Sequence, residues 1–412
     1  MRGDGGGHSY YCIRCQVMKI GILTFHSQLN YGGVLQCWAL QTALEQMGHE
    51  VVVIDRWLSK TNRALECGYN QFNLKPWVKL LVGTILGTGE FGMWVRHLRT
   101  KQFLSKYLKR TRYHFCNWGE APNSLGVDRL VVGSDQIWHS GEWGDPGVYL
   151  LEGRQRYASF PRTIAYAASF GMMSIPDQMA ERYSNGFNRF AAISCREHEG
   201  VALCAKLGFN ALHVADPTLL ICAQEWYKLI DVTHMKSKGR VLVCYLIGID
   251  VQEFIPVLSD FAEEKGCEVR VMVKEDFRRG IPFNFKRLRA NMLGANIKKY
   301  KNVSICYTHG PKEFVQEIAT ATWFVTDSFH GLMFSAIFNK NVRIIEPQNR
   351  DRENMFSRIR EFVETYSEGS VLAKNLNIAL ESLSTGEEVR FDSAGIERKR
   401  QESMQWLREA LG

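Results

Sequence analysis

Apolar and polar positions alternate in blocks along the chain, and these blocks predict strands and helices in turn. Residues 19–25 (KIGILTF) form an apolar run that is typical of a buried strand. Residues 32–48 carry apolar positions at helical spacing, with Gly48 just beyond the last one, and residues 50–56 predict the next strand. Further strands are expected at 128–135, 163–170, 191–197, 211–216, 240–248, 267–273, 321–327 and 341–346. The alternation predicts an α/β fold with parallel sheets.

The chain length predicts two domains, because 412 residues exceed what one hydrophobic core usually supports. The strands fall into two series on either side of Asp216-Pro217, a turn that a domain boundary explains as well as a function does. The opening strand, helix and strand resemble half of a nucleotide-binding fold without its GxGxxG motif. The expected parts are a disordered extension (1–17), an N-terminal Rossmann-like domain (18–217) with an insertion (56–125), a C-terminal Rossmann-like domain (218–360) and polar helices (361–412).

Composition narrows the class of protein and of partner. The chain is 45% hydrophobic and 23% charged, which are ordinary values for a folded soluble protein. Its net charge of +8 favours anionic partners, but no nucleic-acid-binding signature is present, so nucleic acid is not expected. The eleven cysteines lack a disulfide framework, and Cys12 and Cys15 have no partners at zinc spacing, so no metal site is expected. With no apolar run of membrane-spanning length, we expect a cytoplasmic protein.

The insertion carries an unusual distribution of charge. An apolar stretch from residue 78 runs into a basic one, with seven Lys or Arg residues and no acid between Arg96 and Arg112. One interpretation is a solvated helix under a long connection. The other is a surface that makes peripheral contact with an anionic membrane.

Glycine and polar residues cluster where the predicted strands end. Ligands of open α/β sheets bind at this edge, because backbone N–H groups of the following helices point there. After the first strand, Asn30 can cap a helix, while Gly32 and Gly33 allow close approach to a ligand. A tight turn would explain the same residues.

The next cluster follows the strand at 128–132 directly. Its polar density suits recognition of hydroxyl or phosphate groups, although an Asx-turn that begins a helix, with Trp138 in the core, is the alternative. The candidate substrate-binding residues here are Gly133, Ser134, Asp135, Gln136 and His139.

Two further strand ends carry Ser169 and Arg196. The planar guanidinium of Arg196 can hold a carboxylate or a phosphate by two hydrogen bonds. Alternatively, Arg196 pairs with Glu197 or Glu199 at the surface. His198 is expected to face away from Arg196, so it receives no role.

The last cluster lies where the strand at 321–327 meets the next helix. Backbone N–H groups of Phe329, His330 and Gly331, beside Ser328, would begin that helix and form an anion site. The imidazole of His330 can give or take a proton near neutral pH. A single histidine more often fills a core, but its position at a strand end favours a function.

These motifs, taken in order, resemble the polysaccharide pyruvyl transferase family over residues 18 to about 360. The motifs are 30–41 (NYGGVLQCWALQ), 131–139 (VVGSDQIWH), 165–171 (AYAASFG), 194–200 (SCREHEG), 213–220 (HVADPTLL) and 327–340 (DSFHGLMFSAIFNK). The resemblance implies two Rossmann-like domains that face each other across a cleft, as in type-B glycosyltransferases. It also implies phosphoenolpyruvate as the donor, no cofactor, and a sugar hydroxyl pair of a glycan or lipid-linked oligosaccharide as the acceptor.

The resemblance suggests roles for the candidate residues. His330 would be the acid or base, and Arg196 with the backbone of 328–331 would hold the donor. Asp135, Gln136 and His139 would contact the acceptor. Family members often have arginine at the position of Ser328, so another arginine must supply that charge; the candidates are Arg196, Arg343, Arg352 and Arg358. Two alternatives stay open: a sugar-nucleotide-dependent glycosyltransferase of the same fold, and a non-catalytic partner in glycan assembly.

Overall fold

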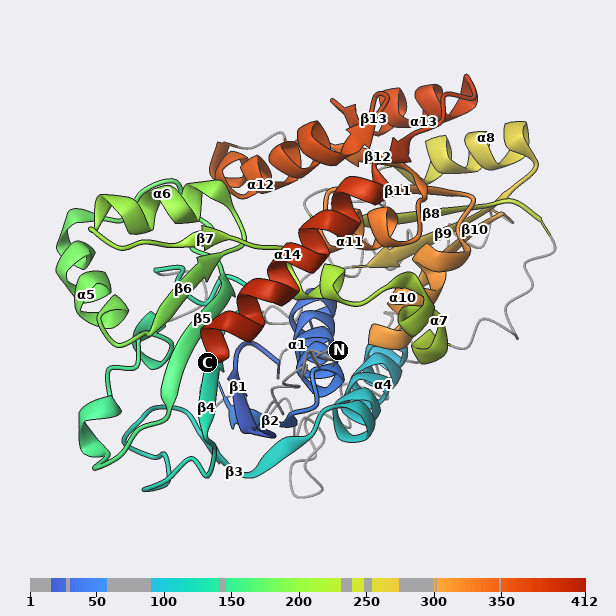
Figure 1. Cartoon of the computed structure of the whole chain (residues 1–412). Coiled ribbons are helices and arrows are strands. Elements are labelled where there is room, and N and C mark those ends of the chain that lie inside the picture. The colour runs from blue at the N-terminus through green and yellow to red at the C-terminus, as the bar shows by residue number, and fades with distance from the viewer. Residues whose placement is uncertain are drawn as a thin grey trace, which may run out of the picture.

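The protein contains two parallel β-sheets, one in each half of the chain (Figure 1). The computed structural model describes residues 16–26, 30–57, 90–140, 145–230, 239–247, 254–273, 300, 302–347 and 350–412. Seven strands form the first sheet, in the order β3-β2-β1-β4-β5-β6-β7. They are β1 (Lys19–Leu23), β2 (Glu50–Arg56), β3 (Arg110–Phe115), β4 (Arg129–Val132), β5 (Arg162–Ala168), β6 (Ala192–Cys195) and β7 (Leu212–His213).

The second sheet repeats this arrangement with six parallel strands in the order β10-β9-β8-β11-β12-β14. In both sheets the first strand lies in the middle and the fourth pairs with its other side, which is the doubly wound order of Rossmann-like folds. The structure therefore confirms the predicted α/β class with two Rossmann-like units. The strands are β8 (Val241–Leu246), β9 (Glu268–Val273), β10 (Val303–Cys306), β11 (Trp323–Thr326), β12 (Asn341–Ile345) and β14 (Leu372–Ala373).

Helices follow the strands and cover the sheets. In the first half these are α1 (Tyr31–Gln46), α4 (Glu90–Tyr107), α5 (Asp177–Phe187) and α6 (His198–Lys206), with 3-10 turns η1 (Pro146–Val148) and η2 (Arg154–Arg156). The connection between the halves contains η3 (Pro217–Leu220) and α7 (Ala223–Ile230). The second half contains α8 (Ile255–Lys265), α10 (Pro311–Thr320), α11 (Phe329–Ile337), α12 (Arg350–Tyr366), α13 (Leu376–Ser384) and α14 (Ser393–Leu411).

Helix α1 lies between the two halves and is buried on nearly all sides. Its Trp38 packs on Trp226 of α7, with 4.8 Å between ring centroids. Its Tyr31 stacks on Phe314 of α10 at 4.5 Å. A helix that is apolar all round needs such burial. One hydrophobic core therefore continues from the first half of the chain into the second.

The C-terminal helix α14 returns to the first sheet, with its end beside β4 and β5 (Figure 1). Arg129 of β4 donates from Nε to the carbonyl oxygen of Leu411 (2.9 Å), and Ser403 Oγ accepts from the backbone N–H of Ala215 (2.8 Å). The segment 361–412, expected to be helical, also contains β14 and two strands that pair with each other, β13 (Ser367–Glu368) and β15 (Arg390–Phe391). Each of these strands has two residues, which is too short for a periodic pattern to appear.

The predicted insertion contributes a strand to the shared sheet, because β3 pairs with β2. Two basic residues of α4 are directed into the protein. Arg96 is buried, with its guanidinium 4.2 Å from the ring centre of Tyr31, and Arg99 donates to the carbonyl oxygen of Thr308 (3.1 Å). At these two residues α4 is packed against the protein rather than solvated, and contact with an anionic membrane stays a prediction. Residues 58–89 and 1–15 lie outside the described residues.

None of the helices among the described residues is both long and apolar enough to cross a membrane.

Candidate functional site

Three neighbouring strands of the first sheet bring Asp135, Ser169 and Arg196 to the same edge. Asp135 follows β4, Ser169 follows β5 and Arg196 follows β6, and these strands are paired side by side. The chain turns sharply at Gly133, which has φ of +117°, and a Cβ there would lie 2.3 Å from the carbonyl oxygen of Tyr166. Glycine at this position lets Asp135 reach the site.

Arg196 is buried among three carboxylates. This group of charges, the nest, consists of Arg196, Asp135, Glu197 and Asp216. Its Nη1 donates to Asp216 Oδ2 (2.9 Å) and its Nε to Glu197 Oε1 (3.0 Å), while Nη2 lies 3.8 Å from Asp135 Oδ1. Ser169 Oγ also donates to Glu197 Oε1 (2.7 Å). Burial alone would lower the pKa of Arg196, but the three carboxylates outweigh it and raise the pKa. The donors Nε and Nη1 of the guanidinium are thus occupied, whereas Nη2 has no hydrogen-bond partner among the described atoms.

Asp216, treated above as a boundary turn, is the acid at the centre of this nest. Its Oδ1 accepts from the backbone N–H (2.9 Å) and hydroxyl (2.7 Å) of Thr218, so it caps η3. Burial alone would raise the pKa of Asp216, but His330, Arg196 and Thr218 together hold it below its usual range. Both oxygens of this buried carboxylate are therefore held in place, Oδ1 by Thr218 and Oδ2 by Arg196.

His330 reaches this nest from the second half of the chain. Ser328 caps α11 by accepting from Gly331 N–H (3.3 Å), and this directs the first turn of the helix toward the first sheet. His330 Nε2 lies 3.9 Å from Asp216 Oδ2. Its ring packs against Gly32 of α1, where a Cβ would lie 2.1 Å from Nδ1. Gly32 therefore makes room for the imidazole.

The side chain of His330 is 12% exposed, and its Nε2 has no hydrogen-bond partner among the described atoms. Burial lowers the pKa of His330 and outweighs the attraction of Asp216 and Asp135. Arg196 and Arg358 lower it further. The imidazole is therefore neutral at physiological pH.

Arg358 of α12 supplies a second cation, and its side chain is 15% exposed. Its guanidinium carbon lies 4.9 Å from the ring centre of Phe329, and that of Arg196 lies 4.6 Å from the same ring. Arg358 Nη1 is 3.7 Å from Glu197 Oε1, and its Nε and Nη1 have no hydrogen-bond partner among the described atoms. Burial, reinforced by repulsion from Arg196, lowers the pKa of Arg358 to about 10.

Of the four arginines considered for the charge missing at Ser328, Arg358 is the best placed. Arg343 is bonded elsewhere, to Ser382 Oγ (2.8 Å) and to the carbonyl oxygen of Glu387 (2.8 Å). The side chain of Arg352 lies outside the described residues.

A cleft of about 360 Å³ opens beside this group. Its walls come from both halves of the chain, and another wall carries His198 and His213. Burial, together with Lys399 and His198, lowers the pKa of His213 to about 3, so its ring is neutral at physiological pH. The lining residues on the side of the nest are Arg196, Asp216, Phe329, Met333 and Arg358.

The remaining candidates have local structural contacts. Asn30 Oδ1 accepts from Gly32 N–H (3.0 Å) and caps α1, and the nearest atom to a Cβ on Gly33 would be Asp135 Oδ2 at 3.5 Å. Gln136 is buried and its amide lies against Gly171. Ser134 is buried, and His139 lies in the turn after it. Of the candidate residues, Arg196 and Phe329 line the described cleft. The lining residues do not include the others: Asn30, Gly32, Gly33, Gly133, Ser134, Asp135, Gln136, His139, Ser169, Ser328, His330 and Gly331.

Comparison with known proteins identifies the family. A profile of the polysaccharide pyruvyl transferase family matches residues 30–349. The chain belongs to the polysaccharide pyruvyl transferase family. The match includes Asp135, Arg196 and His330, whereas Arg358 lies beyond its end. Among curated proteins, none is significantly similar in sequence to this family member.

Solved structures are similar to this pyruvyl transferase family member in fold. UDP-GlcNAc 2-epimerase from Neisseria meningitidis bound to UDP-GlcNAc has a TM-score of 0.50 at 7% identity, covering 95% of this chain and 99% of its own. UDP-GlcNAc 2-epimerase from Methanocaldococcus jannaschii has a TM-score of 0.49 at 13% identity, with 94% and 99% covered. The enzyme from Rickettsia bellii has a TM-score of 0.49 at 9% identity, with 95% of each chain covered. The chain shares its fold with the UDP-GlcNAc 2-epimerase from Neisseria meningitidis.

Proposed function

We propose that this protein transfers the pyruvyl group of phosphoenolpyruvate onto a pair of sugar hydroxyls as a cyclic ketal. The observation that carries this proposal is that Arg358, a cation that lines the cleft, acts electrostatically on the neutral imidazole of His330. Phosphoenolpyruvate carries a carboxylate and a phosphate, and its reaction begins with protonation of a carbon. A cation and a group that can hold a proton match these two needs. Family membership supports the same reaction class.

The first step joins the donor to the acceptor. His330, which takes up a proton as the donor binds, delivers that proton to the methylene carbon of phosphoenolpyruvate, and C2 becomes cationic in character. One sugar hydroxyl attacks C2 and loses its proton, for which Asp135 is the proposed acceptor. Arg358, the free Nη2 of Arg196 and the backbone N–H groups at the start of α11 hold the donor's carboxylate and phosphate.

The second step closes the ketal. The other hydroxyl attacks C2, the C–O bond to phosphate breaks, and the departing phosphate takes up the remaining proton. The product is a cyclic ketal with a methyl group and a carboxylate, together with inorganic phosphate. No cofactor is needed, because the enol phosphate itself supplies the driving force. The proposed acceptor is a surface polysaccharide or its lipid-linked precursor, and the proposed location is the cytoplasm, at the inner face of the membrane where the acceptor is lipid-linked.

The test measures donor binding and phosphate release on the same protein. Phosphoenolpyruvate should raise the melting temperature, and phosphate should be released when a hexoside with a free 4,6-hydroxyl pair, such as p-nitrophenyl galactoside, is added. His330→Asn should reduce the single-turnover rate by roughly 10²-fold, the usual scale for a lost general acid, with little change in melting temperature. His49→Asn, at a remote histidine beside Met18, is the matched control.

The same assay separates the alternatives. Stabilisation by UDP-GlcNAc but not by phosphoenolpyruvate would favour a sugar-nucleotide-dependent transferase. A failure of both ligands to bind would favour a non-catalytic partner in glycan assembly. Equal rates for His330→Asn and the wild type would contradict the role of the imidazole.

A further inference from the structure

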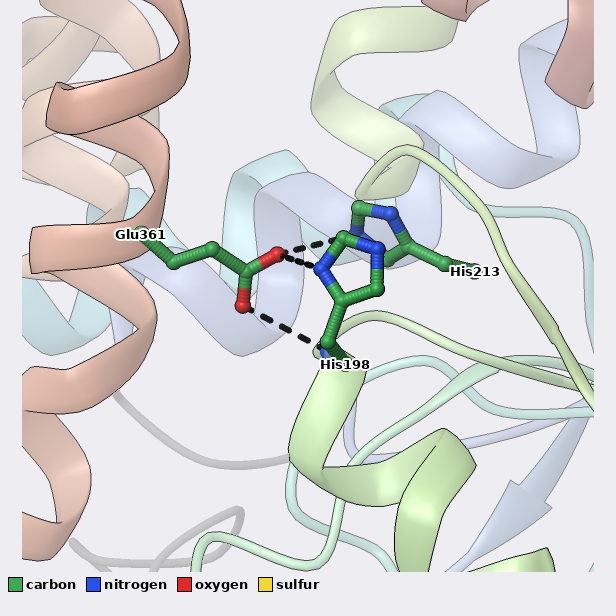
Figure 2. Close-up of side chains that lie close together, drawn as sticks. All are labelled: His198, His213 and Glu361. Atoms are coloured by element: carbon green, nitrogen blue, oxygen red, sulfur yellow. Dashed lines mark hydrogen bonds and ion pairs between the residues drawn. The ribbon is translucent and has the colours of Figure 1, made fainter.

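Three side chains that can bind a metal ion meet at one point (Figure 2). All three line the cleft described above. His198 begins α6, His213 ends β7 and Glu361 lies in α12. We propose that His198, His213 and Glu361 form a binding site for a divalent transition-metal ion of the zinc class. The proposal is independent of the pyruvyl transfer proposed above.

The ligand atoms already converge. One nitrogen from each histidine and one carboxylate oxygen all lie within 4.8 Å of one another. His198 Nδ1 contacts Glu361 Oε1, and His213 Nε2 lies 3.7 Å from the same oxygen. Ligands at zinc distances of about 2.1 Å in tetrahedral geometry are about 3.4 Å apart. Only small side-chain shifts would bring the three atoms to that spacing.

A fourth possible ligand atom, a backbone oxygen, lies beside these three. The backbone carbonyl oxygen of Arg196 is 3.1 Å from His213 Nε2. In the empty site a proton on Nε2 can be shared by this carbonyl and Glu361 Oε1. A metal ion can replace such a proton, because it also binds to nitrogen and oxygen lone pairs.

The ligand types select the class of ion. Two imidazoles and one carboxylate match zinc and its neighbours in the first transition row, and three protein ligands leave a position for water or the Arg196 carbonyl. Magnesium prefers oxygen ligands only, so it fits poorly here. The two histidine rings lie 3.9 Å apart between centroids, which brings both imidazoles to one point.

The surrounding charges are mixed. Lys399 opposes a cation, but its ammonium is directed to the carbonyl oxygen of His213 (2.9 Å). Glu199 and Glu402 act electrostatically on Glu361 and Lys399 respectively, and so add negative charge nearby. The repulsion from Lys399 weakens the site without removing its ligands.

The other cluster of possible ligands is less suitable. In the group Cys306, His309 and Glu317, the carboxylate already accepts from His309 Nε2 (2.9 Å) and from Arg270 Nη1 (3.1 Å). A guanidinium at that distance neutralises the carboxylate and repels a cation. We therefore assign the ion to the cluster at the cleft.

A metal ion here would join the two halves of the molecule. His198 and His213 belong to the first sheet's half, whereas Glu361 belongs to the helix that follows the second sheet. An ion that binds the folded protein and not the unfolded chain raises stability by mass action. Zinc should therefore raise the melting temperature in a saturable way.

The experiment uses the full chain after removal of metals with a chelator. Binding of ZnCl₂ is measured by calorimetry and by melting temperature, with MgCl₂ as the comparison, and CoCl₂ gives a visible absorption spectrum that reports coordination. The test variants are His198→Ala and Glu361→Gln. The matched controls are His49→Ala, at a remote histidine, and Glu364→Gln, an exposed residue of the same helix.

The proposal expects zinc to stabilise the wild type and both controls, and magnesium to have no such effect. Each test variant should lose about tenfold or more in zinc affinity, because one of three protein ligands is gone. His198 is two-thirds exposed, so its replacement should leave the fold intact. Equal zinc affinity in the wild type and the test variants would overturn the proposal, since the variants retain every cysteine. The absence of any saturable stabilisation by zinc would overturn it as well.

Discussion

Replacing Arg358 with methionine should separate the binding of an anionic donor from the stability of the fold. Methionine keeps much of the length of the side chain and its contact with Phe329, but it removes the charge and the buried donors. If the guanidinium serves a ligand, its loss should weaken donor binding without weakening the protein. If the guanidinium serves packing, its loss should lower the stability of the protein and leave donor binding unchanged.

The magnitude follows from the environment of Arg358. Burial and the nearby Arg196 lower its pKa to about 10 from an ordinary value of 12.5. Because folding lowers the pKa of Arg358, its charge destabilises the folded state relative to the unfolded chain at every pH below about 10, where the side chain is protonated in both states. One pKa unit corresponds to about 1.4 kcal/mol, so burial of the charge lowers the free energy of unfolding by about 3 kcal/mol. The variant Arg358→Met should therefore melt no lower than the wild type.

Donor binding should change in the opposite direction. A hydrogen bond to a charged group contributes about 1.5–3 kcal/mol, so the Kd for phosphoenolpyruvate should rise by roughly 10-fold to 100-fold. Calorimetric titration with phosphoenolpyruvate and a thermal melt give both quantities on one sample. Arg360→Met is the matched control, because Arg360 lies two residues further along the same helix, 3.5 Å from Glu346, and its side chain is 41% exposed. Unchanged affinity together with a lower melting temperature would refute this reasoning and make Arg358 a packing residue.

Two further substitutions test the contacts around His330 and Arg196. Gly32→Ala should lower both the melting temperature and the donor affinity, because its Cβ would lie 2.1 Å from His330 Nδ1; Gly33→Ala, whose Cβ would meet its nearest atom at 3.5 Å, should do neither. Asp216→Asn should reduce the free energy of unfolding at neutral pH by about 3–5 kcal/mol, because Arg196 would lose a buried partner. Since folding holds the pKa of Asp216 below its ordinary value of 3.8, its contribution is present above that pH and is lost as the pH falls through the folded-state pKa. The stability difference between Asp216→Asn and the wild type should therefore shrink in acid, and a difference that persisted or grew would contradict the ion pair.

The sequence predicted the part of the site that one sheet builds. Asp135, Ser169 and Arg196 follow strands that are neighbours, and the carboxyl ends of parallel strands share an edge, so their meeting could be expected. The sequence could not show whether Arg196 binds a ligand or pairs with Asp216 and Glu197. That choice depends on side-chain positions, which the sequence pattern does not give. Asp216 itself was visible only as a turn before proline.

The contacts between the halves were beyond sequence reasoning. Arg358 lies in a polar helix, and nothing in its neighbourhood along the chain indicates burial beside Glu197. Gly32 was expected to admit a ligand, whereas the structure shows it against the ring of His330. His198 was expected to point away from Arg196 and therefore received no role. In the structure it contacts Glu361, and both residues line the cleft. Each of these depends on how two sheets are placed, which local periodicity does not encode.

The balance of charge in the site leads to a final prediction about protons. The nest and Arg358 together hold two guanidiniums against three carboxylates, and His330 is neutral because burial lowers its pKa. A donor with a carboxylate and a phosphate would add negative charge to a site that is already net negative. Binding therefore becomes favourable only if positive charge enters with the donor, and His330 is the group that can take up a proton, since a nearby anion raises a histidine pKa.

Phosphoenolpyruvate should thus bind with uptake of about one proton, and its affinity should rise as the pH falls toward 6. Calorimetry in two buffers of different ionisation enthalpy measures that proton directly. His330→Asn should bind the donor more weakly and without the proton, whereas His49→Asn should behave as the wild type. If the wild type bound phosphoenolpyruvate with no buffer-dependent heat, the proton for the enol carbon would have to come from another group, and the assignment of His330 as the acid would fail.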